Sequence, residues 1–454
     1  MPKLFGTSGV RGIVNADLTP QLMFEVGLAV STLIQDRNVG VGCDTRRSGD
    51  MLRSAWLSGV IAGGSKAVDL GILPTPVLAY LTHVVGFEVG AMITASHNPP
   101  EYNGIKLFDR EGVAYGLTQQ SAVESIIENH ESRLASWNNI GTINSIDESS
   151  RYVEMVCDKI HLNKKWNVLV DPGCGASHSI APYLLRLLGC KVTAVNSQPD
   201  GFFPGRTPEP SPESLKSFSL LVKQIGADLG IAYDGDADRV AFVDERGDFI
   251  QFDRSLAAIA GHFLKQNNGG TVVIPIDASM SVDTITLREH GEVERTPVGD
   301  VAIAWAIRKK RAVFGGEPCG AWIMPQFHMC PDGILSSILF LKALETENVT
   351  ASNFISKVPE YPIMRENVSC PTVTKASAMA KLKDRLPAQF HEELKVSLLD
   401  GIKIATEDWW LLLRSSGTEP TIRVTAEAKD EKKAKDLLKL GVAEVSKTIK
   451  EESG

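Results

Sequence analysis

Three stretches of the chain share one order of apolar and polar positions. Each has an apolar run ending in aspartate, a small or polar turn, a helical pattern and a second strand-like run. The first runs are residues 38–44, 166–171 and 271–277, the helical patterns 51–64, 176–189 and 281–291, and the second runs 66–71, 190–196 and 292–299. Strand–turn–helix–strand units favour parallel sheets covered by helices. The repeat predicts three related α/β domains; the alternative is that buried strands merely look alike.

From about residue 362 the pattern changes. It predicts a strand, a helix, two strands and a closing helix, over residues 366–371, 377–387, 400–416, 421–428 and 431–450. The closing helix is amphipathic and rich in lysine, and we expect its charges to form a solvated face. Polar or proline-interrupted stretches near 145–150, 247–250 and 359–365 mark linkers. The predicted domains are therefore three α/β units and a smaller α+β domain, with the boundaries 1–148, 149–249, 250–361 and 362–454.

Composition narrows the class of protein. The 454 residues are 43% hydrophobic and carry a formal net charge of −8, which argues against a general binder of nucleic acid or anionic membranes. No stretch approaches the ~18 consecutive apolar residues of a membrane span, and MPKLFGTSGVRG contains no apolar run fit for a signal peptide. Seven cysteines without a CxxC pair fit reduced thiols. We expect a cytoplasmic protein; the sequence does not indicate an oligomeric state.

The segment GIAYDGDADRVAFVDERG (230–247) gives the strongest chemical signal. Asp234, Asp236 and Asp238 alternate with small residues between two strand-like runs, so three carboxylates can converge on one hard cation such as Mg²⁺. An EF-hand is the rival motif, because a glutamate falls at the twelfth position of the loop. However, the sixth position is Arg239 rather than glycine, and the flanks predict strands rather than helices. We predict a magnesium site, with a solvated acidic turn as the alternative.

The segment LLLRSSGTEPTIRV (411–424) combines hydroxyls, a glycine-containing turn and two arginines. Backbone N–H groups, hydroxyls and guanidinium forks suit the oxygens of a phosphate. The candidate ligands are Arg414, Ser415, Ser416, Gly417, Thr418 and Arg423. No GxxxxGK[ST] motif occurs in the chain, so a nucleoside triphosphate site is unsupported. We predict a phosphate site here; a hairpin turn with incidental polar residues is the alternative.

Other polar loops are ambiguous when taken singly. FGGEPCGAW (314–322) places Glu317 among glycines, where a carboxylate can accept hydrogen bonds from sugar hydroxyls. TASHNPP (94–100) follows an apolar run and ends in prolines, so Ser96 is expected on a rigid loop, either as a nucleophile or as part of a turn. Three further residues fit a site or a surface equally well: Arg11, His97 and Lys106.

Taken in order, these motifs resemble those of the α-D-phosphohexomutase family. The matching segments are FGTSGVRG (5–12), TASHNP (94–99), NGIK (103–106), DGDADR (234–239), GGEPCG (315–320) and RSSGTEP (414–420). The resemblance implies an α/β fold of four domains, three related units with mixed sheets and a C-terminal α+β domain, with the active site in a central cleft. This architecture agrees with the domains that the apolar pattern predicts.

The resemblance also implies a reaction. A hexose 6-phosphate and its 1-phosphate would interconvert through a phosphoserine, matched by Ser96, and a sugar bisphosphate that also serves as activator. One Mg²⁺ per subunit would be bound by Ser96 and the three aspartates. The 414–418 loop with Arg423 would bind the non-reacting phosphate, and Glu317 with Cys319 would contact the sugar. The residues implied around the reacting phosphate are Arg11, His97, Lys106 and Arg239.

One loop departs from the family pattern. Many relatives have Ser where Cys319 stands and His where Ala321 stands, so we expect a looser sugar contact and one proton shuttle fewer. His328 is a candidate substitute, and a structural histidine fits equally well. The GEPCG form is most like archaeal members assigned as phosphoglucosamine mutases, which favours glucosamine 6-phosphate, on the route to UDP-N-acetylglucosamine. A phosphomannomutase/phosphoglucomutase, a silent sugar-phosphate binder and a hydrolase with an aspartate nucleophile are the alternatives.

Overall fold

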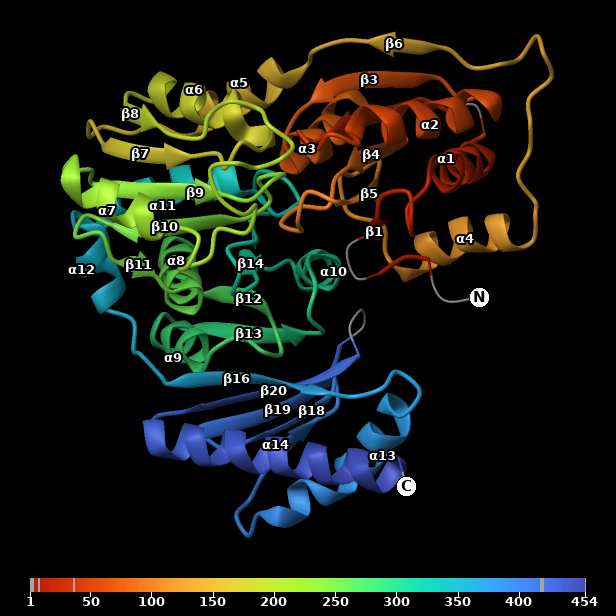
Figure 1. Cartoon of the computed structure of the whole chain (residues 1–454). Helices are drawn as coiled ribbons and strands as arrows, with labels where there is room; N and C mark the ends of the chain where they lie inside the picture. Colours follow the sequence, from red (N-terminus) through yellow and green to blue (C-terminus); the bar gives the residue numbers. More distant parts are fainter. Residues whose placement is uncertain (1–3, 7–8, 36, 417–419, 454) are drawn as a thin grey trace.

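The computed structural model describes residues 4–6, 9–35, 37–416 and 420–453. Its strands form four sheets in chain order, and helices pack on them (Figure 1). The first three sheets lie together in one body, and the C-terminal domain lies below it, joined through β16. Within the described part of the chain, no helix combines the length and apolarity needed to span a bilayer.

The first sheet has the strand order β1-β5-β4-β2-β3-β6. Its strands are β1 (Val10–Ile13), β2 (Val39–Cys43), β3 (Ala67–Ile72), β4 (Val89–Ile93), β5 (Tyr102–Asp109) and β6 (Ile143–Ser145). Its helices are α1 (Pro20–Ile34), α2 (Gly49–Ala62), α3 (Thr75–Val85) and α4 (Leu117–Glu128). The sheet is mixed, because β5 is antiparallel to β4 while β2 is parallel to both β3 and β4. Ser96 therefore follows a buried central strand, and Lys106 returns beside it on β5.

The second sheet has the order β11-β10-β9-β7-β8 and the third the order β13-β12-β14-β15. The second unit contains α5 (Ser149–Lys159), β7 (Asn167–Asp171), α6 (Ile180–Leu187), β8 (Lys191–Ala194), α7 (Lys216–Gln224), β9 (Leu229–Tyr233), β10 (Val240–Asp244) and β11 (Phe249–Ile250). The third contains α8 (Phe252–Gln266), β12 (Gly270–Pro275), α9 (Met280–Arg288), β13 (Gly291–Thr296), α10 (Asp300–Lys310), β14 (Phe314–Gly316), β15 (Trp322–Ile323), α11 (Gly333–Glu347) and α12 (Ala351–Ser356).

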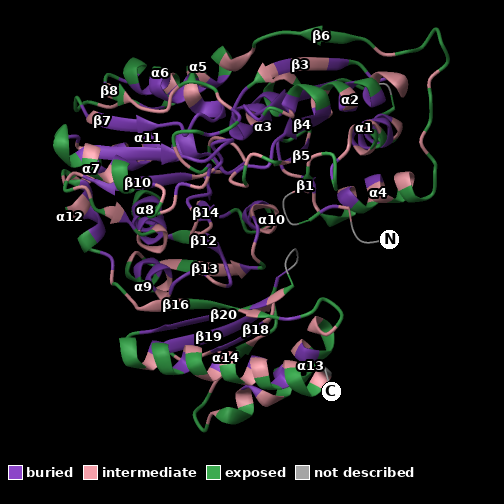
Figure 2. Cartoon of the chain, in the orientation of Figure 1, coloured by how far each residue is buried: buried purple, intermediate pink, exposed green. Residues whose placement is uncertain are grey.

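The predicted threefold repeat is confirmed. In each unit the strand ending near an aspartate pairs in parallel with the strand after the next helix, as β2 with β3, β7 with β8 and β12 with β13. Apolar residues of all three units share one continuous core, from Leu70 to Val358. Figure 2 shows central strands of these sheets, such as β4, β7 and β10, buried, whereas β6 is exposed. The fold class predicted from the sequence is therefore confirmed, and the three units form one packed body.

The C-terminal domain is an antiparallel sheet of order β16-β20-β19-β18-β17. Its elements are β16 (Ile363–Ser369), α13 (Lys375–Arg385), β17 (Lys395–Ser397), β18 (Ile402–Ala405), β19 (Trp409–Ser415), β20 (Thr421–Ala428) and α14 (Glu431–Ser453). The prediction of one strand over 400–416 is wrong, because a turn divides it into β18 and β19, with the Thr406 N–H donating to the Trp409 carbonyl (2.8 Å). The turn has no glycine or proline, and apolar residues flank it on both sides.

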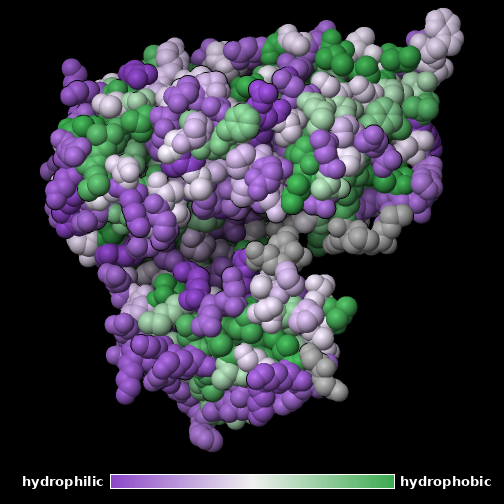
Figure 3. Space-filling view, in the orientation of Figure 1, coloured by the Kyte–Doolittle hydropathy of each residue, from purple (hydrophilic) through white to green (hydrophobic). Residues whose placement is uncertain are grey.

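The C-terminal domain has its own core and contacts the third unit through a small interface. Its core residues lie between Cys370 and Val445, and a separate apolar cluster joins Trp410 and Leu412 to Ile276. Beside that cluster, buried Glu427 accepts hydrogen bonds from the Met280 N–H (2.7 Å) and the Trp410 indole. Figure 3 shows the surface hollowed between this domain and the upper body. The central cleft expected from the sequence falls at this hollow.

Candidate active site

The Ser96 loop is held by buried polar groups. Ser96 has a left-handed backbone conformation (φ 51°), which is uncommon for a residue with a side chain. Its N–H donates to the Thr94 hydroxyl (2.8 Å), which in turn donates to Asp44 (2.7 Å). The fully buried Arg46 pairs with Asp44 and donates to four loop carbonyls, those of Ser96, Asn98, Pro99 and Tyr102. These bonds keep the Ser96 hydroxyl in one place without occupying it.

Arg46 was not predicted from the sequence, and neither was its counterpart in the second unit. Arg206 pairs with Asp171 (2.8 Å) and donates to the carbonyl of Tyr233 (2.5 Å), the residue before the aspartate loop. Both arginines join the aspartate that ends a repeat strand to the loop of the candidate site. The repeat strands ending in aspartate were visible in the sequence, but an arginine's burial depends on contacts between distant segments.

The structure brings the three aspartates to Ser96 and Lys106. Their carboxylate oxygens lie within 4.8 Å of one another, and all three residues are buried. The Ser96 hydroxyl donates to Asp234 (2.6 Å). Lys106 donates to Asp236 (3.0 Å) and also to Asp238. The two loops meet closely, because a Cβ on Gly235 would lie 2.5 Å from the Ser96 carbonyl oxygen.

Burial makes the charges of this cluster interdependent. Desolvation, together with Asp238 and Asp236, raises the pKa of Asp234. Desolvation also opposes ionisation of Asp236, but Lys106 and the Thr75 hydroxyl outweigh it and lower the pKa of that carboxyl. Burial likewise disfavours the Lys106 ammonium, yet the two aspartates raise its pKa. Lys106 is therefore held as a cation against Asp236 and Asp238.

The aspartate loop fits a hard divalent cation. Lys106 uses the Oδ2 atoms of Asp236 and Asp238, while their Oδ1 atoms are buried and have no hydrogen-bond partner among the described residues. A buried carboxylate oxygen without a partner is costly, and converging carboxylate oxygens are the ligands that Mg²⁺ prefers. The donor set therefore agrees with the magnesium site that the sequence predicts.

Three more predicted residues lie at or near the Ser96 loop. His97 Nδ1 lies 3.2 Å from Ser96 Oγ, and burial with Arg239 and Arg11 lowers the pKa of its imidazole. Arg11 donates to Asn98 (3.2 Å), and its buried Nε has no partner among the described residues. Arg239 pairs with Glu209 (3.3 Å), which also faces His97 (3.7 Å). Glu209 was not predicted, because PEPSPES has no feature that distinguishes it from a surface turn.

The candidate sugar loop follows β14. Glu317 accepts from the Gly299 N–H (3.0 Å), and burial, with Asp300 nearby, raises the pKa of its carboxyl to about 8. Cys319 is half-buried, and desolvation raises the pKa of its thiol despite neighbouring Arg239. Cys319 is therefore a neutral thiol, a weak hydrogen-bonding group as the sequence predicts.

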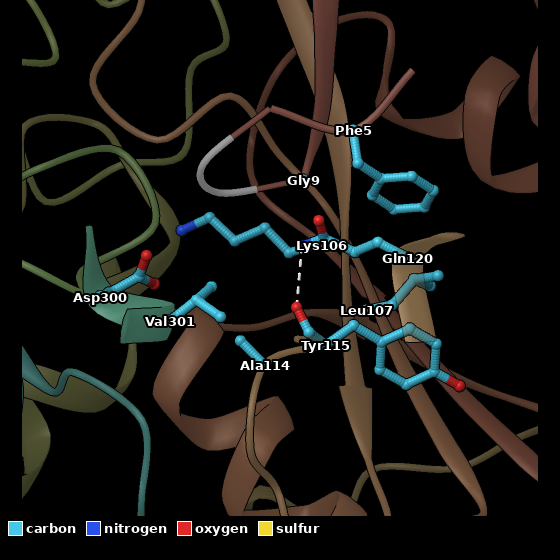
Figure 4. Close-up of a pocket in the computed structure, with 9 residues that line it drawn as sticks. All are labelled: Phe5, Gly9, Lys106, Leu107, Ala114, Tyr115, Gln120, Asp300 and Val301. Carbon is cyan, nitrogen blue, oxygen red and sulfur yellow. Dashed lines mark hydrogen bonds between the residues drawn. The ribbon is translucent and has the colours of Figure 1, made fainter. Parts of the chain in front are cut away.

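A small cavity joins the first and third units beside Lys106. Figure 4 shows Phe5 and Gly9 on one side, Asp300 and Val301 of α10 on the other, and the Lys106 ammonium reaching toward Asp300. Its volume of ≈ 10 Å³ is room for about one water molecule. The N-terminus of α10 therefore packs against the catalytic lysine candidate.

The candidate phosphate loop lies at the end of the β19–β20 hairpin. Arg414 and Arg423 stand directly opposite each other in the two strands, an arrangement of like charges that an anion would stabilise. Ser415 ends β19, and the Ser416 N–H donates to the Thr421 carbonyl (3.0 Å). Two residues of the predicted phosphate site, Gly417 and Thr418, lie outside the described residues.

His328 has a structural position. Its Nε2 lies 2.8 Å from Asp332 Oδ2, and its Nδ1 faces the Cys330 N–H at 3.3 Å. Asp332 also accepts from the Tyr152 hydroxyl and from the Leu335 N–H, which caps α11. Both ring nitrogens are thus engaged in holding a helix end, so the interpretation of His328 as a structural histidine holds.

Comparisons with known proteins show the family of the chain. Four phosphoglucomutase/phosphomannomutase models match the chain: α/β/α domain I at residues 2–134, domain II at 150–247, domain III at 251–361 and the C-terminal domain at 367–440. The chain belongs to this family, the α-D-phosphohexomutases, and is a mutase of the isomerase class. A solved structure of Aspergillus fumigatus N-acetylphosphoglucosamine mutase, 16% identical with a TM-score of 0.60, is described as a complex with GlcNAc-6P and magnesium.

Individual relatives cover nearly the whole chain. A protein of Pyrococcus horikoshii described as "probable phosphoglucosamine mutase" is 43% identical over 451 residues, 99% of each chain. A protein of Methanothermobacter thermautotrophicus with the same description is 43% identical over 436 residues, 96% of each. Among solved structures, a phosphoglucomutase/phosphomannomutase family protein of Burkholderia thailandensis has a TM-score of 0.88 and 25% identity, covering 100% of this chain and 98% of its own. The resemblance seen in the sequence is therefore confirmed.

Proposed function

We propose that this mutase interconverts glucosamine 6-phosphate and glucosamine 1-phosphate through phosphorylated Ser96 and a sugar bisphosphate. The relatives described as phosphoglucosamine mutases support the substrate, at 43% identity over nearly the full length. The placement of the Ser96 hydroxyl against Asp234 carries the proposal (2.6 Å). It puts a hydroxyl in the cation-binding cluster, where phosphoryl transfer needs charge neutralisation most.

In the first transfer, a sugar hydroxyl oxygen bonds to phosphorus as the bond from phosphorus to Ser96 Oγ breaks. The hydroxyl proton leaves the sugar oxygen as the new bond forms, and Ser96 Oγ takes up a proton as it is released. His97 Nδ1 lies 3.2 Å from Ser96 Oγ and would relay this proton, but burial beside Arg239 and Arg11 lowers the pKa of its imidazole and makes it a weak base. Lys106 and Arg11 stay cationic and stabilise the phosphoryl oxygens. Mg²⁺, one ion per subunit bound by Ser96 and the three aspartates, would neutralise further charge on the transferring group. Ser96 then takes back the other phosphate of the bisphosphate.

Both poses of the sugar need the same two contacts. Arg414, Arg423 and the serines of the β19–β20 hairpin would bind the non-reacting phosphate, whichever end of the sugar it is on. Glu317 and Cys319 would contact the hydroxyls between the two phosphates. Enzyme isolated without phosphate on Ser96 would need a sugar bisphosphate as activator, because only the phosphorylated enzyme can begin the cycle.

The test supplies glucosamine 6-phosphate, glucose 6-phosphate and mannose 6-phosphate separately, with Mg²⁺ and a trace of the matching bisphosphate. We expect the matching 1-phosphates, with the highest kcat/KM for glucosamine 6-phosphate. A higher kcat/KM for glucose 6-phosphate or mannose 6-phosphate would instead indicate a phosphomannomutase/phosphoglucomutase. Inorganic phosphate as the main product would indicate a hydrolase, and binding without any product a silent sugar-phosphate binder.

A further inference from the structure

One short segment of the third unit contacts both substrate-binding loops. The Gly299 N–H donates to Glu317 in the sugar loop (3.0 Å). The preceding N–H, of Val298, donates to Oδ2 of Asp400 (3.0 Å), and the same oxygen accepts from Nε of Arg414 (2.9 Å). Two neighbouring backbone groups thus join the candidate sugar contact to the candidate phosphate contact, and Asp400 is the link between the domains.

The local backbone fixes where Asp400 stands. It lies in the turn between β17 and β18, followed by Gly401 in a left-handed conformation (φ 95°). A Cβ on Gly401 would lie 2.2 Å from the Leu413 carbonyl oxygen, so only glycine lets this turn approach β19 so closely. The approach is one residue before Arg414. Asp400 is partly shielded, with 27% of its side chain exposed, and Arg414 is 14% exposed.

We propose that Asp400 is a positioning residue for the mutase reaction, which sets the spacing between the sugar-hydroxyl contact and the contact for the non-reacting phosphate. An arginine held at Nε keeps its two terminal amino groups as a fork for phosphate oxygens. Because Asp400 also accepts from Val298, the position of that fork follows the loop that orients Glu317. The inference rests on the proposed function, since it assigns a partner to the loop that binds the phosphate in both poses.

Spacing matters more to a mutase than to a one-way enzyme. The sugar bisphosphate binds in two orientations, and each must place a different phosphate at Ser96 while the other reaches Arg414. A fork that is free to shift relative to Glu317 would still bind phosphate, but it would misplace the reacting end. Loss of Asp400 is therefore expected to impair both reaction directions, and to do so only while Arg414 is present.

The test is a double-mutant cycle on the full-length enzyme. Asp400→Asn keeps the shape of the side chain and removes its charge, and we expect kcat/KM to fall about tenfold from either monophosphate. The kcat/KM of Arg414→Ala should be lower still. In the Arg414→Ala background, Asp400→Asn should lower kcat/KM by less than a further twofold, because Asp400 acts through Arg414. Asp408→Asn is the matched control: it removes an exposed carboxylate from the β18–β19 turn of the same domain, where its partner is Lys429, and activity should stay at the wild-type level.

Two results would overturn the inference: wild-type kcat/KM in Asp400→Asn, or a full tenfold loss added to Arg414→Ala, which would mean that Asp400 acts on stability alone. Failure of the proposed function is distinguishable, since wild-type enzyme would then form no 1-phosphate from any hexose 6-phosphate. In that case the same cycle is measured by calorimetry as affinity for glucosamine 6-phosphate, and additive losses of affinity would still contradict the role of Asp400.

Discussion

The Ser96 loop and the phosphate loop differ in how they are held. Ser96 lies in the shared body of three units, with Arg46 bonded to four carbonyls of its loop. The phosphate loop belongs to a domain with its own core, attached by a small apolar cluster and by polar contacts such as those of Glu427 and Asp400. The proposed reacting group is thus fixed, while the proposed contact for the other phosphate belongs to a domain with its own core. This division suits a reaction whose intermediate must turn around.

The largest effect is expected from disturbing the fixed end. Asp236→Asn should lower kcat by roughly a hundredfold or more, because the cation proposed for this cluster would supply several kcal/mol of charge stabilisation. Asp248→Asn, which removes an exposed carboxylate beyond β10, is the control. Chelation should abolish turnover in the wild type and Mg²⁺ should restore it, as followed by 1-phosphate formation. Full activity in excess chelator would contradict the metal site.

Arg46→Ala tests whether the serine loop is held as the structure indicates. The change leaves Asp44 buried and unpaired, which should lower the free energy of unfolding by about 3–5 kcal/mol and reduce kcat. Arg246→Ala is a matched control, because Arg246 pairs with Asp244 in the same i, i+2 geometry at the end of β10 but is 63% exposed. Urea denaturation measures the free energy of unfolding of both variants and of the wild type. Equal stability of the two variants would show that the buried pair does not hold the loop.

The smallest effect is expected at the sugar contact. Because the pKa of Glu317 is raised to about 8, the carboxyl is protonated at about pH 6.5, and Glu317→Gln should raise KM less than threefold there. Above its pKa the carboxyl ionises and no longer resembles the neutral amide of glutamine. The difference in KM between wild type and Glu317→Gln should therefore widen at about pH 9.5. Glu317→Ala should raise KM about tenfold at either pH. Glu294→Gln, on β13, is the control. A difference in KM between wild type and Glu317→Gln that narrows as the pH rises would contradict the raised pKa of Glu317.

The sequence predicted what depends on local pattern. Strands ending in aspartate and the alternation in DGDADR indicated the three α/β units and the aspartate cluster. It did not indicate Arg46, Arg206 or Asp400, because their roles come from contacts between segments far apart in the chain. The division of 400–416 into two strands was missed because of the local pattern itself. Apolar residues on both sides of a short polar turn look like one continuous strand.

The most direct test of the account is the phosphate on Ser96 itself. Intact-mass and peptide analysis of wild-type enzyme, treated with sugar bisphosphate and freed of it, should show one phosphoryl group on Ser96. Addition of glucosamine 6-phosphate without bisphosphate should remove that group and yield bisphosphate in equal amount. Ser96→Ala should carry no phosphate and lose turnover by several orders of magnitude. An active enzyme that never bears phosphate on Ser96, or a Ser96→Ala variant with wild-type turnover, would contradict the account.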